Sequence, residues 1–317
     1  MPDIKNLKSM ENRVLTTFSQ GWNPQDMINR IVCPPIPVTR SKGDYMVDKN
    51  GLRLYDTERA PRTRAKTVDF EHGTSSWSTK DHWLSVLLDK DEIEEAQATG
   101  LEALMNIKQD AVSLVMNLLE AKREKAVADR VMGTSYYHND FQKDIASTPW
   151  NDQTNGDPIA DIMEAVKAVR SVGAVANALV MSGAVYDALC VHPAMLDYFK
   201  MQMGRLTDAQ ILSMFRGVTR IVIGDATYNS GTEDAAVLTP YWGDHCAVVP
   251  INSLQELKQG RKAHTVVFDR LNAYKSLEHD EGETVRMIQK VEWGILTINT
   301  QHGYLIENAV AELSEGE

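Results

Sequence analysis

Three groups of residues in this chain have the types and spacing that chemistry requires. The first surrounds Gly156, where Asp152, Asn155 and Asp157 offer the oxygen ligands that hard cations prefer. Their spacing does not match a calcium loop, and Asn-Gly-Asp-Pro is typical of a turn followed by a helix cap. We therefore predict a turn here.

The second group is an acidic run, and the third is a histidine beside a cysteine. The run could bind a cation or a basic partner, but charge runs are usually solvated loops, which is the structure we predict. His245 and Cys246 suggest a base and a nucleophile, yet neighbours in a strand point to opposite faces, so a buried strand pair is predicted instead. The acidic run comprises Glu278, His279, Asp280, Glu281 and Glu283.

Known catalytic motifs do not occur in the sequence. No glycine-rich dinucleotide loop follows a predicted strand, and Gly260-Arg261-Lys262 lacks the upstream Gly and the following Ser/Thr of a phosphate loop. His-Glu-x-x-His and Gly-x-Ser-x-Gly are also missing. The other histidines have no metal spacing: His72, His82, His138, His192, His264, His279 and His302. We predict no catalytic, cofactor-binding or metal-binding residue, and no enzyme.

Composition favours a folded chain of one large domain or two ordinary ones. Of its 317 residues, 43% are hydrophobic and 24% are charged. No run of 18 apolar residues occurs, and the N-terminus has no apolar signal core, so neither a membrane span nor export is expected. Cys33, Cys190 and Cys246 are far apart and odd in number, which fits a reducing compartment without disulfides.

The charge is divided unevenly along the chain. The net charge is −11, whereas proteins that coat DNA usually carry a basic surplus. Residues 1–66 have a net charge of +5, and residues 67–317 have −16. Two interpretations stay open: a basic segment that pairs with the acidic body of a neighbouring copy, or a disordered basic tail before an acidic domain.

The first 70 residues predict an arm and a polar hairpin. A short helix is expected over 25–30, and Pro34, Pro35 and Pro37 then force an extended path. Val38 is expected to open a strand, with turns at 41–44 and 48–51. So polar a stretch cannot fold alone. It is either a floppy loop or a β-hairpin that packs on another subunit, and buried strands resume at Val68, Phe70, Trp77, Trp83, Val86 and Leu87.

A long helix is predicted over residues 89–132. Asp89 and Glu92 fit a capping box, apolar residues then recur every three or four positions, and Gly133 ends the pattern. Unbroken, it is about 65 Å long, against about 50 Å for a compact globule of this chain, which predicts a flattened subunit. A break at Gly100 leaves about 48 Å.

The remaining residues predict an α+β body. Asp157-Pro158 caps a helix that Gly173 closes, and short strands and helices then alternate. Strands are expected at 177–182, 218–223, 245–249, 265–268, 285–288 and 295–298, and short helices at 185–189, at 195–199 and after Thr207.

This order of elements resembles that of tailed-bacteriophage major capsid proteins with the Hong Kong 97-type fold, over nearly the whole chain. Several stretches are also similar to that family, namely Leu52 to Pro61, Trp150 to Asp152, Asp157 to Ile162, Asn177 to Ser182, His192-Pro193, Ile221 to Ala226, Tyr241 to Gly243, and Gly303 to Ile306. The resemblance implies five parts: an N-terminal arm (1–37), an extended β-hairpin loop (38–75), a peripheral-domain strand and spine helix (76–157), an axial domain (158–284), and a C-terminal return to the peripheral domain (285–317).

The resemblance also implies a structural function. Copies would self-assemble as pentamers and hexamers into the icosahedral head around a tailed-phage double-stranded DNA genome, with the extended loop and N-arm reaching onto neighbours. A separate scaffolding protein, a portal and, where one attaches, a decoration protein are the other expected partners; DNA is held only loosely and no membrane is involved. The expected location is the virion, after assembly in the bacterial cytoplasm. Some relatives crosslink through lysine, but no partner is recognisable for Lys42, Lys49 or Lys66, so no crosslink is predicted.

Two alternatives remain. An encapsulin-type cellular compartment keeps the fold and encloses an enzyme in place of DNA. An unrelated α+β enzyme or carbohydrate-binding protein with an unrecognised site predicts a small, discrete species in solution.

Overall fold

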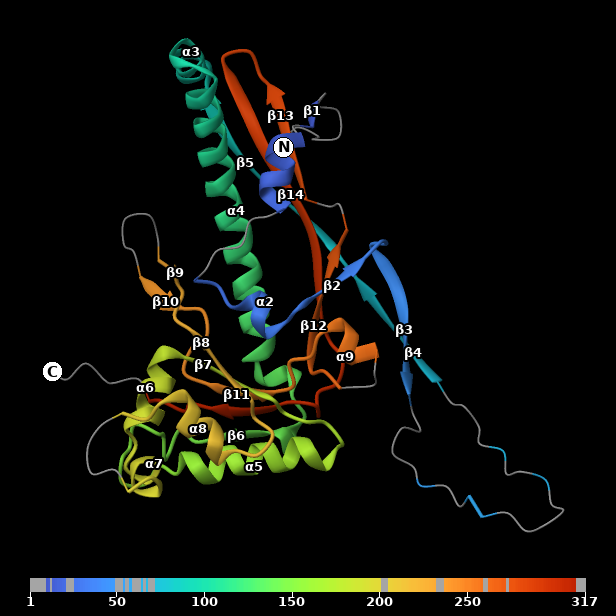
Figure 1. Ribbon diagram of the computed structural model, residues 1–317, viewed down its shortest axis with the longest axis vertical. Helices are drawn as coiled ribbons and strands as arrows, with labels where there is room; N and C mark the ends of the chain where they lie inside the picture. Colours follow the sequence, from blue (N-terminus) through green and yellow to red (C-terminus); the bar gives the residue numbers. More distant parts are fainter. Residues whose placement is uncertain are drawn as a thin grey trace.

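The computed structural model describes residues 10–11, 13–20, 26–48, 72–200, 205–231, 237–258, 262–271 and 274–311, together with residues 54, 57, 58, 64 and 67. The molecule is elongated (Figure 1): a rod of helix and strands rises from a globular lower body, and a hairpin projects from their junction. Helices and sheets are mixed along the chain, as the predicted α+β class requires.

The rod is built on α4 (Leu101–Val131), with α3 (Lys90–Thr99) at its tip. Of the two alternatives for this helix, the break is the one observed, because Gly100 interrupts it at φ 141 and ψ 165, a region that essentially only glycine reaches. The predicted capping box is wrong, since the side chain of Asp89 makes no capping hydrogen bond. The 31 residues of α4 span about 46 Å. The length of the rod therefore depends on α3 and α4 together with the strands beside them.

The first sheet runs along the rod and is organised by β14 (Thr284–Thr297). This is one continuous strand, where the sequence predicted two. One side of β14 pairs with β5 (Lys80–Asp89) from Trp293↔Lys80 to Thr284↔Asp89. The other side pairs with β13 (Lys275–Asp280) and β12 (Thr265–Arg270). The sheet packs on α4 through a buried apolar cluster that includes Val112, Val115, Met116, Met287 and Val291.

The described part of the N-terminal arm packs on its own chain. It contains β1 (Met10–Glu11), α1 (Arg13–Gln20), α2 (Asn29–Val32) and β2 (Pro35–Val38). β1 pairs with β13, β2 pairs with β12, and Leu15 of α1 is fully buried. The extended path through the prolines is confirmed, although Val38 ends a strand and does not open one, and α2 begins later than the predicted helix. The expectation that the arm also reaches onto a neighbour stays a prediction.

The projecting hairpin consists of β3 (Lys42–Asp48) and β4 (His72–Ser78), paired antiparallel along their whole length. The turn predicted at 41–44 is wrong, because residues 42–44 lie in β3. Gly43 faces Trp77, and a Cβ at this glycine would lie 2.8 Å from the indole ring. Trp77 in turn stacks on Phe268 of β12, with 4.7 Å between ring centroids. The root of the hairpin therefore packs on its own sheet.

The middle of the extended loop is described at five positions only. Residues 54, 57, 58, 64 and 67 are all exposed, and Leu54 is completely so. The predicted Asn50-Gly51 turn and the predicted buried residues Val68 and Phe70 lie outside the described residues.

The lower body is built on a second sheet with the order β6-β15-β11-β7-β8. Asp157 caps α5 as predicted, since its Oδ1 accepts a hydrogen bond from the Ala160 N–H at 3.0 Å, and Thr207 forms a capping box with Gln210. The predicted strands over 177–182, 218–223 and 245–249 are confirmed with small shifts. The strands are β6 (Gln142–Asp144), β7 (Ala178–Ser182), β8 (Arg220–Gly224), β11 (Cys246–Val249) and β15 (Tyr304–Glu307), and the helices are α5 (Pro158–Ser171), α6 (Gly183–Val191), α7 (Pro193–Tyr198) and α8 (Asp208–Met214).

Smaller elements complete the described chain. They are two short 3-10 helices, η2 (Thr134–Tyr136) and η3 (Asn139–Phe141), the β9 (Thr227–Asn229) and β10 (Leu238–Pro240) hairpin, and α9 (Leu254–Lys258). Within the described residues, no helix is both long enough and apolar enough to cross a bilayer.

Candidate assembly surface

The residues around Gly156 are engaged with one another. Asp152 accepts hydrogen bonds from the side chain of Asn155 at 2.8 Å and from the backbone N–H of Thr154 at 3.0 Å. These bonds, led by that from Asn155, lower the pKa of Asp152. Asp157 is the cap of α5. The geometry is therefore that of the predicted turn and cap, and no group of three or more His, Cys, Asp or Glu side chains within the described ranges could hold a metal ion.

His245 and Cys246 do not form a catalytic pair. Cys246 is fully buried in the lower-body core, and burial raises the pKa of its thiol far above the usual value. His245 precedes the strand, and its Nδ1 accepts a hydrogen bond from the backbone N–H of Asn308 at 3.0 Å. A thiol this hard to ionise is a poor nucleophile.

The acidic run is part of the sheet, so the prediction of a solvated loop is wrong for its first half. Glu278 and Asp280 lie on β13, where they pair with Lys108 and Lys90, each at 3.1 Å. These pairs hold β13 against α3 and α4. A backbone hydrogen bond from Gly282, together with Lys90, lowers the pKa of Asp280.

A buried carboxylate on α4 joins the arm, the rod and the body. Glu124 has no exposed surface. It accepts hydrogen bonds from the backbone N–H groups of Ile28 at 3.2 Å and Asn29 at 2.8 Å, and from the indole N–H of Trp242 at 2.7 Å. Charge-assisted bonds of this kind are stronger than neutral ones. Glu124 therefore fixes the start of α2 against both the rod and the lower body.

Two further buried charges flank Glu124. Glu120 pairs with Arg30 of the arm at 2.6 Å, and Arg123, 1% exposed, pairs with Asp269 at 3.2 Å. Burial opposes ionisation of Arg123, but Tyr274, Asp269 and Glu120 outweigh it and raise the pKa. Sequence reasoning missed these residues. Their burial could have been predicted from their positions in the sequence, because Glu120 and Arg123 continue the spacing of three and four residues between buried positions along α4.

A second buried carboxylate closes the root of the hairpin. Glu292 on β14 is 2% exposed and accepts hydrogen bonds from Thr79 and Arg270, both at 2.6 Å. Arg270 also donates to Ser41 at 3.0 Å. Burial alone raises the pKa of Glu292, but the hydrogen bonds from Thr79, Ser41 and Arg270 lower it to about 2. Ser41 precedes β3 and Thr79 follows β4, so this network sets the direction in which the hairpin leaves the body.

The rod exposes apolar side chains on two elements. On β5, Trp83 is 39% and Leu87 is 50% exposed, so the prediction that they are buried is wrong for a single copy. We call this pair the strand patch. On α4, Leu114 and Leu118 lie one turn apart and are 54% and 53% exposed, and we call them the helix patch. β5 also pairs with β14 along one side only within the described sheet, so its other edge is open to a further strand.

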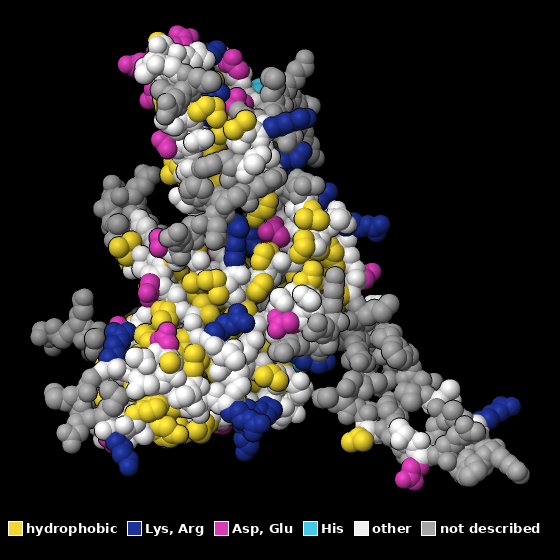
Figure 2. All heavy atoms as spheres, viewed as in Figure 1, with side chains coloured by type: hydrophobic (Ala, Val, Ile, Leu, Met, Phe, Trp, Pro, Cys, Tyr) yellow, Lys and Arg dark blue, Asp and Glu magenta, His cyan; other side chains and the backbone are white. Residues whose placement is uncertain are grey.

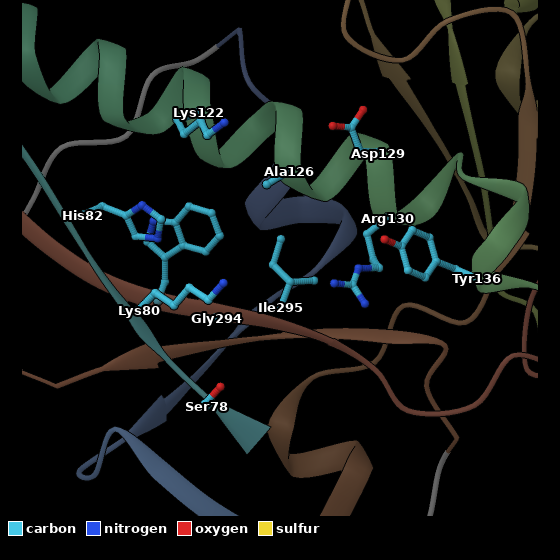
Figure 3. Close-up of a pocket in the computed structure, with 11 residues that line it drawn as sticks. Ser78, Lys80, His82, Lys122, Ala126, Asp129, Arg130, Tyr136, Gly294 and Ile295 are labelled. Atoms are coloured by element: carbon cyan, nitrogen blue, oxygen red, sulfur yellow. The ribbon is translucent and has the colours of Figure 1, made fainter. Parts of the chain in front are cut away.

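A basic cleft of about 360 Å³ lies between α4 and the strands β5 and β14 (Figure 3). Lys122 and Arg130 enter it from α4, and Lys80 enters it from β5. The ring of His82 stacks on Trp293 at 4.2 Å. Burial, followed by Lys122 and Lys80, lowers the pKa of His82, which disfavours a charge on the imidazole. The cleft offers three cationic side chains, which suit an anionic partner.

Comparisons with known proteins agree with this architecture. No family model matches the chain. The chain is 26% identical over 244 residues to the major capsid protein of Burkholderia phage BcepMu, covering 75% of this chain and 76% of that protein. It superposes with a TM-score of 0.74 and 19% identity on a phage-related protein from Bordetella bronchiseptica, covering 95% and 98% of the two chains. For the mature capsid of bacteriophage PhiM1, the TM-score is 0.54 at 10% identity, covering 90% and 88%.

The rod, the projecting hairpin and the shared architecture are those of the Hong Kong 97-type fold, which this chain has in common with phage capsids. The sequence match is more specific. The relative that it identifies is a tailed-phage major capsid protein, and the comparisons support the same structural role, in the head shell, for this chain.

Proposed function

We propose that copies of this chain assemble as pentamers and hexamers into an icosahedral head that encloses the double-stranded DNA of a tailed phage. The observation that carries the proposal is the match to a phage major capsid protein over three quarters of the chain, together with the shared fold. Assembly in the host cytoplasm with a separate scaffolding protein, a portal and, where one attaches, a decoration protein belongs to the same proposal. So does the division into arm (1–37), extended loop (38–75), peripheral domain and spine (76–157), axial domain (158–284) and C-terminal return (285–317).

The described surface of a single copy supports assembly, because the rod leaves large apolar side chains exposed to water.

The strand patch and the helix patch are the apolar parts of that surface for which we propose partners. Trp83 and Leu87 on β5, and Leu114 and Leu118 on α4, leave large side chains in water in a single copy. Covering each of them with a neighbour is favourable by about 25 cal/mol per Å² of apolar area. The open edge of β5 offers backbone hydrogen bonds to the same neighbour.

The acidic body supports loose contact with the packaged DNA. Residues 67–317 carry a net charge of −16, which disfavours tight binding of phosphates to the wall. A purely structural, non-catalytic role accords with the carboxylates of the Gly156 turn being engaged in that turn and with the buried, un-ionised Cys246.

Expression of the chain with and without a scaffold, followed by negative-stain microscopy, tests the proposal. Wild-type chain is expected to form closed shells. Leu87→Asp places a charge in the strand patch and is expected to leave folded but unassembled protein. Val175→Asp is the control, because Val175 is similarly exposed, at 55%, but lies outside both patches. Wild-type protein that stays a small discrete species refutes the proposal.

The encapsulin alternative shares the fold and differs in its contents. Purified particles that contain a co-expressed enzyme, and that form without any phage scaffold, would support the compartment. The match to a phage major capsid protein favours the head shell.

A further inference from the structure

The basic cleft carries more positive charge than its surroundings neutralise. Lys80, Lys122 and Arg130 line it, and none of the three pairs with a carboxylate within the described part of the chain. Asp129 also lines the cleft, but it is held by Lys125. Arg130 stacks over the ring of Tyr136 at 4.2 Å, but a ring does not neutralise its charge. Three cations without a carboxylate partner among the described residues, around a hollow of about 360 Å³, leave a site that an anionic group stabilises.

The tip of the rod carries the opposite surplus. The outer side of α3 exposes Asp91, Glu92, Glu94 and Glu95, and none of them forms an ion pair among the described residues. Acidic side chains gather over this tip in Figure 2. The opposite side of α3 buries Ile93 and Ala96, so the helix is held in place by its apolar side while its carboxylates face solvent.

The cleft and the acidic tip cannot meet within one copy. Lys122 lies 21 residues beyond the start of α4, which is about 32 Å along the helix axis. Along the sheet, β5 begins at Lys80 in the cleft and ends at Asp89, where α3 begins, and its ten residues span about 30 Å. Two elements thus give the same separation, and the complementary charges stand at opposite ends of one rigid rod.

We propose that the acidic helix α3 of one copy docks in the basic cleft of a second copy. The proposal rests on the proposed function, because it requires that copies associate. A contact between two different surfaces is heterologous, so each copy can give its tip to one neighbour and receive the tip of another. Such contacts build rings or extended arrays, as a shell requires. The cleft lies beside the root of the hairpin, so docking there would also bear on the direction of the extended loop.

Two other binding partners are possible for these surfaces, and the experiments below distinguish them from a second copy's α3 in the cleft. The first is nucleic acid in the cleft, which the net charge of −16 on residues 67–317 disfavours. The second is the basic extended loop of a neighbour on α3, which would leave the cleft without a role. Exchanging a positive charge of the cleft for a negative charge of α3 distinguishes both alternatives from the proposal, because only docking of α3 in the cleft predicts that the double variant recovers assembly.

The first experiment reverses one charge on each side. Lys122→Glu and Glu95→Lys are each expected to lower the assembled fraction at least about tenfold, because like charges brought together at an interface cost several kcal/mol. The double variant with both substitutions is expected to recover assembly. Lys167→Glu on α5 is the matched control, since Lys167 is exposed on a helix and has no carboxylate partner in the described chain. Circular dichroism and the melting midpoint verify that each variant is folded.

Normal assembly of Lys122→Glu overturns the proposal, and so does a double variant as defective as either single variant. A defect in Glu95→Lys alone, with Lys122→Glu unaffected, assigns α3 to the basic loop and also overturns it. Wild-type chain that fails to assemble contradicts the proposed function itself, which is a distinct result.

A second experiment does not depend on charge. Particles are assembled from a mixture of Lys122→Cys and Glu95→Cys chains and then treated with a bismaleimide whose spacer matches the reach of a lysine–glutamate ion pair. The native cysteines Cys33, Cys190 and Cys246 are buried, so they react little with it. The spacer is needed because a direct disulfide requires Cα atoms about 4.4–6.8 Å apart, closer than an ion pair of two long side chains brings them. Only docked copies place the two thiols within reach of the spacer. A covalent dimer on a non-reducing gel is expected, and its absence from assembled particles overturns the proposal.

Discussion

Replacing Glu292 by Gln tests the network at the root of the hairpin. In the folded chain the pKa of Glu292 is about 2, against an ordinary value of 4.5. A difference of about 2.5 between these pKa values corresponds to about 3 kcal/mol of stability. Since the folded pKa is the lower one, this contribution is fully present above about pH 4.5 and is lost as the pH falls toward 2. The variant has no carboxylate to titrate at this position.

Urea unfolding of unassembled protein, followed by tryptophan fluorescence, measures the effect. At pH 7, Glu292→Gln is expected to lower the free energy of unfolding by about 3 kcal/mol. Below about pH 4.5, the gap between wild type and variant should narrow by up to about 1.4 kcal/mol per pH unit. Glu164→Gln is the control, because the side chain of Glu164 is 56% exposed and should change stability little. A gap that stays constant from pH 7 to pH 3.5 refutes the reasoning.

Three further predictions concern single residues. Glu124→Gln keeps one acceptor oxygen for Ile28 and Trp242 but turns an amide NH2 donor against the N–H of Asn29, and should lower the free energy of unfolding by about 3 kcal/mol in guanidinium titrations. Gly100→Ala places a Cβ at φ 141 and should cost about 1–3 kcal/mol by the same measurement, although nothing lies within 4 Å of that Cβ. Burial lowers the pKa of His264 from 6.5 to about 4; the wild-type chain should therefore lose about 3 kcal/mol between pH 6.5 and 4, a loss that is absent in His264→Gln.

The order of elements could be predicted because each has a local signal. The cap of α5 lies in Asp157-Pro158, the extended path of β2 lies in its prolines, and the spacing of apolar residues marks α4. Such signals depend on only a few neighbouring residues. The same locality explains why the resemblance to a capsid fold is visible in the amino-acid sequence alone.

The errors arise where distant residues decide the structure. The sequence around Gly100 permits either a continuous helix or a break. In the structure the helix is broken, and Lys90 at the start of α3 pairs with Asp280 of β13. Charged residues on a helix are usually solvated, and the sequence pattern alone predicts this for Glu120, Arg123 and Glu124. Their buried partners come from distant parts of the chain, such as the N-terminal arm and Trp242.

Trp83 and Leu87 show a different limit. Their apolar character predicts burial, and a single copy does not bury them. In the proposed shell, a neighbour would do so. The sequence pattern of an assembling protein reflects its assembled state, so the prediction fails for the isolated chain.

The extended hairpin provides the most direct test of the central claim, which is that this chain completes its contacts only with other copies. Residues 49–71 are replaced by Asn-Gly, a turn that suits the two antiparallel strands at Asp48 and His72. Static light scattering with size-exclusion chromatography then compares the two proteins. We expect shells from the wild type, and folded monomers with an unchanged melting midpoint from the variant. Shells of wild-type size from the variant, or a monomeric wild type, would contradict the account.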